Sequence, residues 1–276
     1  MSRARTVEGL AVDIRRAATP KGRAEVGAYV IEGTRLFERA LRAGAEIVAA
    51  IHADDYSTRD EPRQASIIAD LVSGSTELFS LPRQDITELT AGRKFGAIIG
   101  LVRIPVKADL ANILANGSPQ TRILAAIEVE DPGNVGALMR TALASGAGAL
   151  LTTGVSDPYH PRAIRTSMGA VFRLPLIEMK TSEVIASLHD SGLQTAATVA
   201  TGGEDIRTFV WPPPPLAILM GSEAHSLPEE IIREASYRVS IPMADNIDSF
   251  SVNAAAAIVL HQATHCAEEP RPVDPK

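Results

Sequence analysis

Residues 123–146 read ILAAIEVEDPGNVGALMRTALASG, and this stretch decides the fold of the second half of the chain. The apolar run 123–129 predicts a buried strand, which ends at the Asp-Pro-Gly turn 131–133. Residues 134–145 then have helical spacing and stop at Gly146. A buried strand that passes through a tight turn into a helix is the repeating unit of an α/β sheet with parallel strands.

Strand and helix patterns alternate in the same way along the rest of the chain. The predicted strands are 28–32, 47–52, 77–81, 97–104, 150–152, 176–178, 195–199, 216–220 and 237–241. The predicted helices are 35–43, 66–72, 86–89, 161–167, 181–191, 228–235 and 251–266. We therefore expect an α/β protein whose second half is a mostly parallel sheet with helices on both faces.

The length of 276 residues suggests two domains. The turn-rich sequence Asn-Gly-Ser-Pro at 116–119 predicts a boundary close to it. We expect a small N-terminal α/β domain over residues 1–107, a linker over 108–120 and a second domain over 121–276.

The composition excludes several classes of protein. Apolar residues make up 45% of the chain and charged residues 22%, which excludes wholesale disorder. The apolar runs are much shorter than the roughly 20 residues of a membrane helix, and no secretory signal follows the first arginines. The single cysteine, Cys266, excludes an internal disulfide and a Cys-rich zinc site. We expect a cytoplasmic, reduced setting and no membrane association.

The net charge of −6 argues against indiscriminate binding of nucleic acid. Residues 1–107 nevertheless hold 16 Lys and Arg against 14 Asp and Glu, whereas the remainder holds 11 against 19. Such asymmetry is typical of a polyanion-binding segment beside an acidic domain, although a solvated helix face gives the same counts. Aromatic residues, at 4%, are too scarce to favour a base-stacking platform.

Three segments that follow predicted strands combine glycine with polar residues. They are 130–142 (EDPGNVGALMRTA), 219–228 (LMGSEAHSLP) and 241–253 (IPMADNIDSFSVN). Ligands of open α/β sheets bind beyond the carboxyl ends of the strands, so these segments are the candidate site. In the first, Asn134 could cap the helix or offer an amide, and Arg140 lies nearly two turns further along.

Each segment also has an ordinary structural explanation. Arg140 could pair with a carboxylate such as Glu223, because buried arginines are usually paired. The segment around Gly221 could be a tight turn capped by Ser226, and the third segment a loop with Asp248 or Ser249 capping a helix.

Common catalytic and nucleotide-binding motifs are absent from the sequence. It contains no G-x-G-x-x-G after a strand, no phosphate-binding P-loop and no G-x-S-x-G nucleophile elbow. His261 and His265 have a spacing that suits a metal, but no third ligand is placed beside them, so we expect no metal.

At the three segments the chain resembles the SpoU/TrmH family of SPOUT RNA methyltransferases. Residues 131–147 (DPGNVGALMRTALASGA), 220–227 (MGSEAHSL) and 241–258 (IPMADNIDSFSVNAAAAI) resemble the family's three motifs in order. Residues 159–175 resemble its Arg-x-Ser-x-Gly segment, and 29–33 (YVIEG) a strand of the N-terminal substrate-binding domain of many members.

The resemblance implies a catalytic domain with a deep trefoil knot, a feature that general topology rules make very rare. It also implies a homodimer with the active site near the subunit interface, and S-adenosylmethionine held largely by backbone groups. The positions that match or adjoin the family's cofactor contacts are Gly221, Ile241, Met243, Phe250 and Asn253.

The reaction implied by the resemblance is methyl transfer to a ribose 2′-hydroxyl of structured RNA, with ribosomal RNA favoured over transfer RNA. A ribose hydroxyl is a poor nucleophile at neutral pH and needs a polarising group. The residue that matches the family's catalytic arginine is Arg140, which would act across the dimer interface. Because arginine stays protonated, we expect it to polarise the 2′-oxygen and bind the adjacent phosphate. Asn134 and Glu223 match residues that position Arg140 and the substrate.

The third motif departs from the family pattern Ser-Leu-Asn-Val-Ser. Ser251 occupies the usual asparagine position and Asn253 stands two residues later, as if the pair were exchanged. Ser251 is the expected catalytic-site residue of this motif, although its hydroxyl is shorter than an amide. Two rival functions follow: an RNA-binding protein of the same fold that has lost turnover, and methylation of a base nitrogen.

Overall fold

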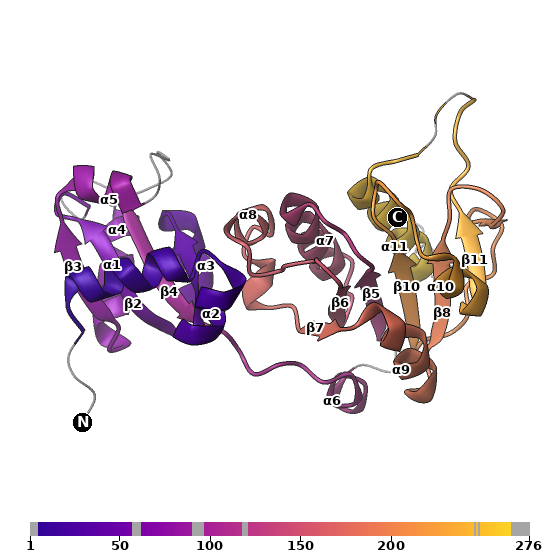
Figure 1. Ribbon diagram of the computed structural model, residues 1–276, viewed down its shortest axis with the longest axis horizontal. Helices are drawn as coiled ribbons and strands as arrows, with labels where there is room; N and C mark the ends of the chain where they lie inside the picture. The colour runs from indigo at the N-terminus through magenta and orange to yellow at the C-terminus, as the bar shows by residue number, and fades with distance from the viewer. Residues whose placement is uncertain are drawn as a thin grey trace, which may run out of the picture. The chain divides into compact units, whose positions relative to one another are not determined.

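We describe the protein from a computed structural model that covers residues 5–56, 62–89, 97–117, 121–245, 247 and 249–265. Cys266 and Asp248 therefore lie outside the described residues. The chain divides into two compact units (Figure 1). Unit 1 comprises Met1–Val106 and Tyr159–Arg173, and unit 2 comprises Lys107–Pro158 and Leu174–Lys276. No helix of the described residues is long and apolar enough to cross a membrane.

Unit 1 contains a mixed sheet flanked by short helices. Its strands are β1 (Ala28–Glu32), β2 (Ile47–Ala53), β3 (Glu77–Leu81) and β4 (Ile98–Arg103). Its helices are α1 (Val7–Arg16), α2 (Pro20–Val26), α3 (Thr34–Arg42), α4 (Pro62–Ser73), α5 (Arg83–Leu89), α8 (Pro161–Thr166) and the 3₁₀ turn η1 (Ala170–Phe172). The strand order is β1-β4-β2-β3, with β2 and β3 parallel and the other pairs antiparallel.

Helices α1 and α2 were missed by the strand and helix predictions, although each begins at a clear cap. Thr6 and Thr19 accept hydrogen bonds from the backbone of Gly9 and Gly22, and Pro20 occupies the first turn of α2. Leu10 and Ile14 are buried on one side of α1. The closely spaced basic residues of this region thus stand on amphipathic helices that pack in unit 1.

Residues Tyr159–Arg173 follow the second strand of the other sheet in sequence, but by their contacts they belong to unit 1. The ring of Tyr159 lies 5.0 Å from that of Tyr29, and Phe172 stacks on Tyr29 at 6.5 Å. Burial, together with Tyr159, raises the pKa of the Tyr29 hydroxyl far above its usual range, so Tyr29 remains neutral. The YVIEG strand therefore packs, through the ring of Tyr29, against the segment that carries Arg-x-Ser-x-Gly.

Unit 2 is built on a seven-stranded sheet in the order β7-β6-β5-β10-β8-β11-β9, in which all pairs are parallel. Its strands are β5 (Arg122–Ala126), β6 (Ala149–Thr153), β7 (Leu176–Met179), β8 (Gln194–Thr198), β9 (Glu204–Asp205), β10 (Leu216–Met220) and β11 (Tyr237–Ser240). Its helices are α6 (Leu110–Asn116), α7 (Pro132–Ala144), α9 (Val184–Asp190), α10 (Glu229–Glu234), α11 (Val252–His265) and the 3₁₀ turn η2 (Thr181–Glu183).

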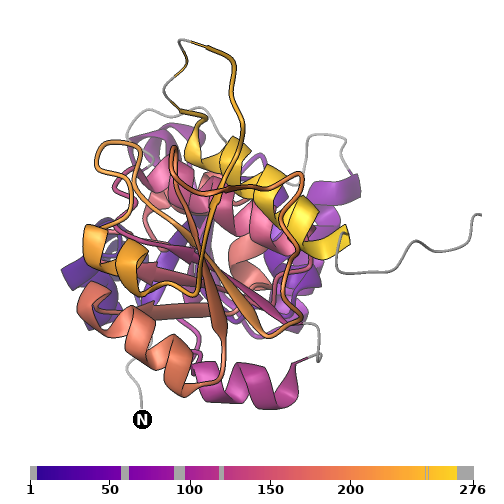
Figure 2. The same cartoon turned by 90° about the vertical axis from the view of Figure 1, so that its right-hand side faces the viewer.

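Helices cover both faces of this sheet, which confirms the predicted α/β class. Figure 2 shows α11 (yellow) and α7 on one side and α6, α9 and α10 on the other. Strands β5, β6 and β10 are buried along their whole length, as is typical of parallel strands covered on two sides. The strand order places β10 between β5 and β8. The trefoil knot that the resemblance implies stays a prediction.

Residues 108–120, which we expected to be a linker, contain the helix α6. Asp109 caps α6 by accepting a hydrogen bond from the backbone of Ala111 at 3.2 Å. Leu110 is buried in the apolar core of unit 2, and Ile113 and Leu114 pack against that core. The spacing of these three residues is helical, and the turn-rich residues that follow concealed it.

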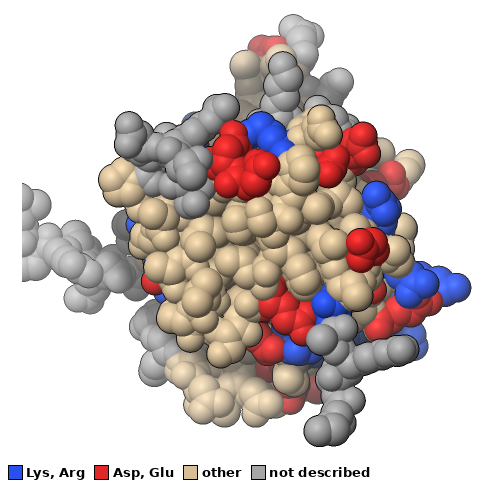
Figure 3. Space-filling view, turned by 90° about the vertical axis from the view of Figure 1, so that its left-hand side faces the viewer, with Lys and Arg blue, Asp and Glu red and all other residues tan. Residues whose placement is uncertain are grey.

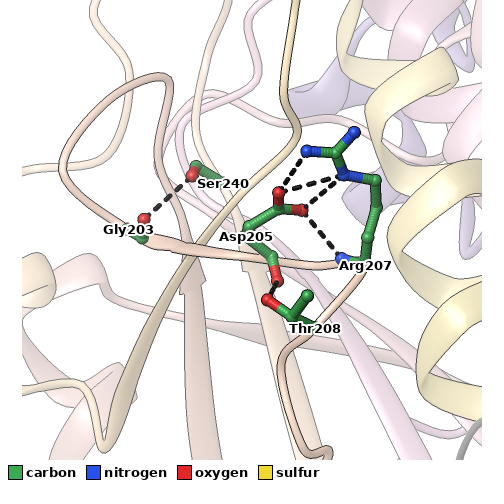
Figure 4. Close-up of polar contacts among 5 residues, drawn as sticks. All are labelled: Gly203, Asp205, Arg207, Thr208 and Ser240. Carbon is green, nitrogen blue, oxygen red and sulfur yellow. Dashed lines mark hydrogen bonds and ion pairs between the residues drawn. The ribbon is translucent and has the colours of Figure 1, made fainter.

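The far edge of the sheet of unit 2 is held by side chains around β9 (Figure 4). The Ser240 hydroxyl donates to the carbonyl of Gly203 at 3.0 Å. Asp205 accepts hydrogen bonds from the side chain and the backbone of Arg207. Hydrogen bonds from Arg207 lower the pKa of the exposed Asp205 carboxyl. Because β11 leads directly into Ile241, this edge supports one wall of the site described next.

Candidate functional site

The candidate site of unit 2 is a pocket at the carboxyl ends of β8, β10 and β11. The first of the three segments singled out follows β5, the second follows β10, and the third follows β11 and leads into α11. The second and third line the pocket. The lining residues are Thr198, Val199, Ala200, Met220, Gly221, Ser222, Glu223, Ser226, Leu227, Ile241, Met243, Ser249, Phe250, Val252 and Ala255. Parallel strands that end at one edge of a sheet present their following loops together, and this explains why segments distant in sequence meet here.

Gly221 occupies a position where no side chain fits. A Cβ added there would lie 2.2 Å from the carbonyl carbon of Ser226 and 2.3 Å from the backbone nitrogen of Leu227. Ser226 itself has a φ of 59°, in the left-handed region that glycine prefers. The chain thus doubles back tightly after β10, and this fold of the backbone forms the floor of the pocket.

The sequence did not indicate Thr198, which the structure places in the pocket wall at the end of β8. Its Oγ1 atom is buried and has no hydrogen-bond partner among the described residues. A buried hydroxyl without a partner is costly in a folded protein, and one that lines a pocket is available to a ligand. A lone threonine at a strand end carries no sequence signal of this role.

The expected cofactor residues are placed in two different ways. Gly221, Ile241, Met243 and Phe250 all line the pocket. Phe250 remains 41% exposed despite its size, so its ring is available to cover a ligand. Asn253 does not line the pocket and is instead engaged in a polar contact with α7. The side chains around the pocket are mainly apolar or hydroxyl-bearing, with Glu223 the single carboxylate among them.

A chain of polar side chains joins the three motifs. The Asn253 side-chain amide donates to Asn134 Oδ1 at 3.0 Å, and the Asn134 amide donates in turn to the Glu223 carboxylate. Asn134 therefore does not cap α7, as had been considered. The cap is Asp131, which accepts from the backbone of Asn134 at 3.1 Å. This arrangement leaves the side chain of Asn134 oriented by a donor and an acceptor, rather than bound to its own helix.

Ser251 is exposed and serves the start of α11. Its hydroxyl accepts from the backbone of Ala254 at 3.4 Å, and its carbonyl accepts from Ala255 at 3.0 Å. Ser251 does not line the pocket, so no contact within this chain supports the catalytic role that we expected for it. The asparagine two residues later makes the contact with Asn134 instead.

Arg140 is exposed on α7 and does not line the pocket. Among the residues that the structure describes it forms no ion pair, and Glu223, the carboxylate considered as its partner, is bound to Asn134 instead. The described residues therefore do not support the explanation that Arg140 pairs with a carboxylate. A charged side chain that is exposed on a motif helix and forms no ion pair among the described residues is free to meet a second molecule.

No metal site is found among the described residues, since no group of three or more His, Cys, Asp and Glu side chains is placed to hold an ion. The side chain of His265, one of the two histidines considered for a metal, lies outside the described part of the structure.

Comparison with known proteins bears on the unit that carries this pocket. Residues 121–261 match the family described as the SpoU rRNA Methylase family, and the match covers just over half of the 276 residues. The matched span includes all three segments of the site and the chain of contacts from Asn253 to Glu223.

Individual relatives extend the similarity to nearly the whole chain. A 23S rRNA (adenosine(1067)-2'-O)-methyltransferase of Streptomyces azureus is 27% identical over 247 residues, which covers 88% of each chain. A 23S rRNA (guanosine(2553)-2'-O)-methyltransferase of Bacillus subtilis is 23% identical over 90% of this chain and 93% of that one. The crystal structure of an AdoMet-bound rRNA methyltransferase from Sinorhizobium meliloti is 28% identical, with a TM-score of 0.80 over 95% of this chain and 97% of that one.

Proposed function

The chain belongs to the SpoU rRNA Methylase family, and from that premise we propose that it is an S-adenosylmethionine-dependent RNA methyltransferase that acts on a ribose 2′-hydroxyl of ribosomal RNA. The observation that carries the proposal is the meeting of the three motif segments: the second and third line one pocket, and side-chain hydrogen bonds join both of them to the first. The fold agrees over nearly the whole chain with that of the AdoMet-bound relative.

The pocket has the character that S-adenosylmethionine requires. Backbone groups around Gly221 are brought to the surface because no side chain covers them, and Ile241 and Phe250 offer apolar walls to an adenine ring. Thr198 Oγ1 supplies a hydrogen-bonding group that the protein leaves unused among the described residues. When bound, this cofactor would supply the methyl group from its sulfonium and leave as a neutral thioether, and the proton of the acceptor hydroxyl would pass to solvent.

Arg140 is the residue that we assign to the acceptor hydroxyl. Its guanidinium stays protonated, so it would polarise the 2′-oxygen and bind the neighbouring phosphate through its planar set of donors. The contact from Asn253 through Asn134 to Glu223 would hold the Glu223 carboxylate in place beside the pocket. These three residues therefore act as positioning residues, and most of the rate would come from placing the hydroxyl in line with the methyl group.

We assign the completion of the site to a second copy of the chain. In one copy Arg140 is exposed and outside the pocket, and Phe250, which lines the pocket, leaves 41% of its surface open. A homodimer in which Arg140 reaches the pocket of its partner accounts for both observations. Mixing Arg140→Ala protein with Gly221→Val protein should then restore activity, since one composite site is intact. No recovery after verified subunit exchange would place Arg140 in its own chain's site.

Unit 1 is the part that we assign to RNA recognition. Its sequence carries the positive balance of the chain, and it includes the Arg-x-Ser-x-Gly segment. The two 23S rRNA relatives modify an adenosine and a guanosine, so the acceptor base differs between relatives of similar distance. The test is incubation of the purified protein with S-adenosylmethionine labelled in its methyl group and separately with bulk rRNA and bulk tRNA. We expect label in rRNA. Label in neither RNA, with cofactor binding verified by calorimetry, would contradict the proposal.

The rival function, an RNA-binding protein without turnover, was motivated by the exchange of Ser251 and Asn253. Asn253 makes the amide contact to Asn134 from its new position, so the exchange leaves the site with an amide at that point. This contact supports an active enzyme over the rival.

A further inference from the structure

Unit 1 contains a second hollow, of about 480 Å³, that the methyl-transfer site does not use. It lies between the start of α3 and the Arg-x-Ser-x-Gly segment. Its lining residues are Glu32, Gly33, Thr34, Arg35, Leu36, Arg39, Arg63, Arg165 and Met168. Four guanidinium groups thus face one space together with a single carboxylate, in a chain whose net charge is −6. On the face drawn in Figure 3, by contrast, acidic and basic side chains are interspersed around a broad uncharged area.

Two of the arginines that line the hollow, Arg35 and Arg39, form no ion pair with a carboxylate among the described residues. Arg35 is exposed, and its guanidinium forms no ion pair or hydrogen bond among the described residues. Arg39 donates to the carbonyl of Met168, which leaves its charge in place. Arg63 pairs with Glu38, and the hydrogen bond from Arg63 lowers the pKa of that carboxyl. Several like charges held around one space repel each other unless an anion enters it.

The hollow is a built arrangement in which the two sides fit each other. Gly169 has a φ of 87°, and a Cβ there would lie 2.7 Å from Cδ of Arg39. The glycine of the Arg-x-Ser-x-Gly segment therefore gives Arg39 room to lie across the backbone. The carbonyl of Met168, the preceding residue, then holds the guanidinium of Arg39. Arg39 is half-buried as a result, and its orientation is fixed by the neighbouring segment.

The start of α3 adds backbone donors to the same space. Gly33 precedes the nine-residue helix with a φ of 91° and no side-chain cap. The first N–H groups of a helix have no acceptor within the helix, and the helix dipole favours negative charge at this end. The N–H of Gly33 donates to the carbonyl of Ile98, but Thr34 and Arg35, the first two residues of the helix, also line the hollow, so their N–H groups and the arginine side chains lie around one space.

We propose that this hollow binds a backbone phosphate of the RNA substrate, held by Arg35 and Arg39 together with the first turn of α3. A phosphodiester supplies the negative charge that these two arginines do not find in a carboxylate, and its two free oxygens suit the planar donor pair of a guanidinium. Such contacts fix the register of an RNA without reading its bases. The inference rests on the proposed function, because it names where unit 1 holds the RNA that unit 2 methylates.

The test measures binding of an in vitro transcribed 23S rRNA by the full-length protein, without S-adenosylmethionine, at several salt concentrations. Arg35→Ala is the variant of choice, because Arg35 is exposed and supports no contact of the fold among the described residues. We expect its Kd to rise about tenfold. The slope of log Kd against log salt should fall by roughly one, which is the amount that the loss of one phosphate contact predicts. Arg35→Lys should keep the slope, because it keeps the charge.

The matched control is Arg103→Ala. It removes one basic residue from the same unit. Arg103, the last residue of β4, pairs with Glu46 and does not line the hollow. We expect its Kd to stay within about twofold of that of the parent. Equal affinities and equal salt slopes for Arg35→Ala and Arg103→Ala would overturn the proposal, whether both match the parent or both are weakened.

Binding and methylation separate this inference from the function on which it rests. If the parent methylates rRNA while Arg35→Ala binds it as tightly as the parent, the hollow is not an RNA site although the proposed function stands. If the parent transfers no methyl group to rRNA while Arg35→Ala still lowers RNA affinity and the salt slope, the hollow binds RNA and the proposed function fails.

Discussion

The two units hold their candidate ligand sites by opposite means. The pocket of unit 2 is enclosed by backbone, apolar side chains and hydroxyl groups, and Glu223, the one carboxylate among its described lining residues, accepts a hydrogen bond from an amide. The hollow of unit 1 is lined by four arginines that surround a helix start. The first arrangement suits a compact ligand recognised by shape and a few hydrogen bonds, whereas the second suits a polyanion recognised by charge.

The comparison teaches that net charge is a poor guide to what this chain binds. A value of −6 for the whole chain conceals a local excess of positive charge in unit 1. Cofactor binding should therefore depend little on salt and RNA binding strongly, within one protein. Arg140 is the exception to this division between an uncharged pocket in unit 2 and a charged hollow in unit 1, because it is a charged group that we assign to the chemistry of unit 2.

The largest effect is expected for Arg140→Ala. Removing a donor that stabilises the reacting oxygen should lower the rate of methyl transfer by about 10²- to 10³-fold. The affinity for S-adenosylmethionine should stay within a few-fold, because Arg140 does not line the pocket. Single-turnover transfer and calorimetry measure the two quantities. Arg233→Ala, which removes another exposed arginine of unit 2, is the control and should retain the parental rate. A parental rate for Arg140→Ala would remove Arg140 from the mechanism.

The next effect concerns the polar contact between the motifs. Asn253→Ala deprives Asn134 of its donor and should lower the rate of transfer about tenfold or more, whereas Ser251→Ala should change it only slightly. Because Asn253 acts through Asn134, the effects of Asn253→Ala and Asn134→Ala should not add in the double variant. A double-mutant cycle on the single-turnover rate tests this. Additive effects would mean that the two amides act separately.

Gly221→Ala should destabilise unit 2, because its Cβ would meet backbone atoms that no change of rotamer can move. Overpacking of this kind costs about 2 kcal/mol of unfolding free energy. Affinity for S-adenosylmethionine should fall with it, whereas the salt dependence of RNA binding should not change. Denaturant unfolding measures the first effect. Gly9→Ala in α1 is the control, since a Cβ there makes only an ordinary contact at 3.4 Å. Equal stability of Gly221→Ala and the parent would contradict the tight turn.

Thr198→Val separates ligand binding from folding. The hydroxyl of Thr198 is buried without a partner among the described residues, so its removal should leave stability unchanged or raise it slightly. If this hydroxyl binds the cofactor, the Kd for S-adenosylmethionine should rise about fivefold to tenfold. Calorimetry and thermal unfolding on the same samples decide the matter. An unchanged Kd would show that Thr198 only lines the pocket.

The smallest effect is expected at the sheet edge. The Asp205 carboxyl has its pKa lowered by Arg207, so the ion pair stabilises the fold at pH values above the unfolded pKa of about 3.9. The contribution is lost as the pH falls through the lower folded pKa. The difference in Tm between the parent and Asp205→Asn should therefore be small near neutral pH and should vanish in strong acid. A difference that grows as the pH falls would contradict this assignment.

Local patterns predicted much of the fold correctly. Strands β1, β3 and β10 have the residues that their apolar runs predicted, because a short apolar run bounded by turns has few alternatives. The capped helices α1 and α6 were missed because their apolar residues are few and lie among charged or turn-forming neighbours. The order of the strands in space depends on contacts between distant segments, which no local pattern specifies.

Local patterns also indicated where a candidate site lies. The second and third segments that the sequence singled out line a pocket, since glycine and polar residues after parallel strands indicate a ligand edge. The roles of the site residues stay predictions, and the hydrogen-bond partners of the side chains were not predicted. Asp131 rather than Asn134 caps α7, and Asn253 rather than Ser251 meets the first motif. Which of two neighbouring side chains faces a third depends on the exact start of α11, and a shift of two residues turns a helix by more than half a turn.

Identifying the atom that receives the methyl group tests the proposed ribose 2′-O-methylation most directly. Bulk rRNA methylated by the protein with labelled S-adenosylmethionine is hydrolysed in alkali, which cleaves RNA at every nucleotide with a free 2′-hydroxyl. We predict that the label is recovered in alkali-resistant dinucleotides, and that Arg140→Ala protein yields none above background. Label recovered in single nucleotides would place the methyl group on a base and contradict the proposed reaction.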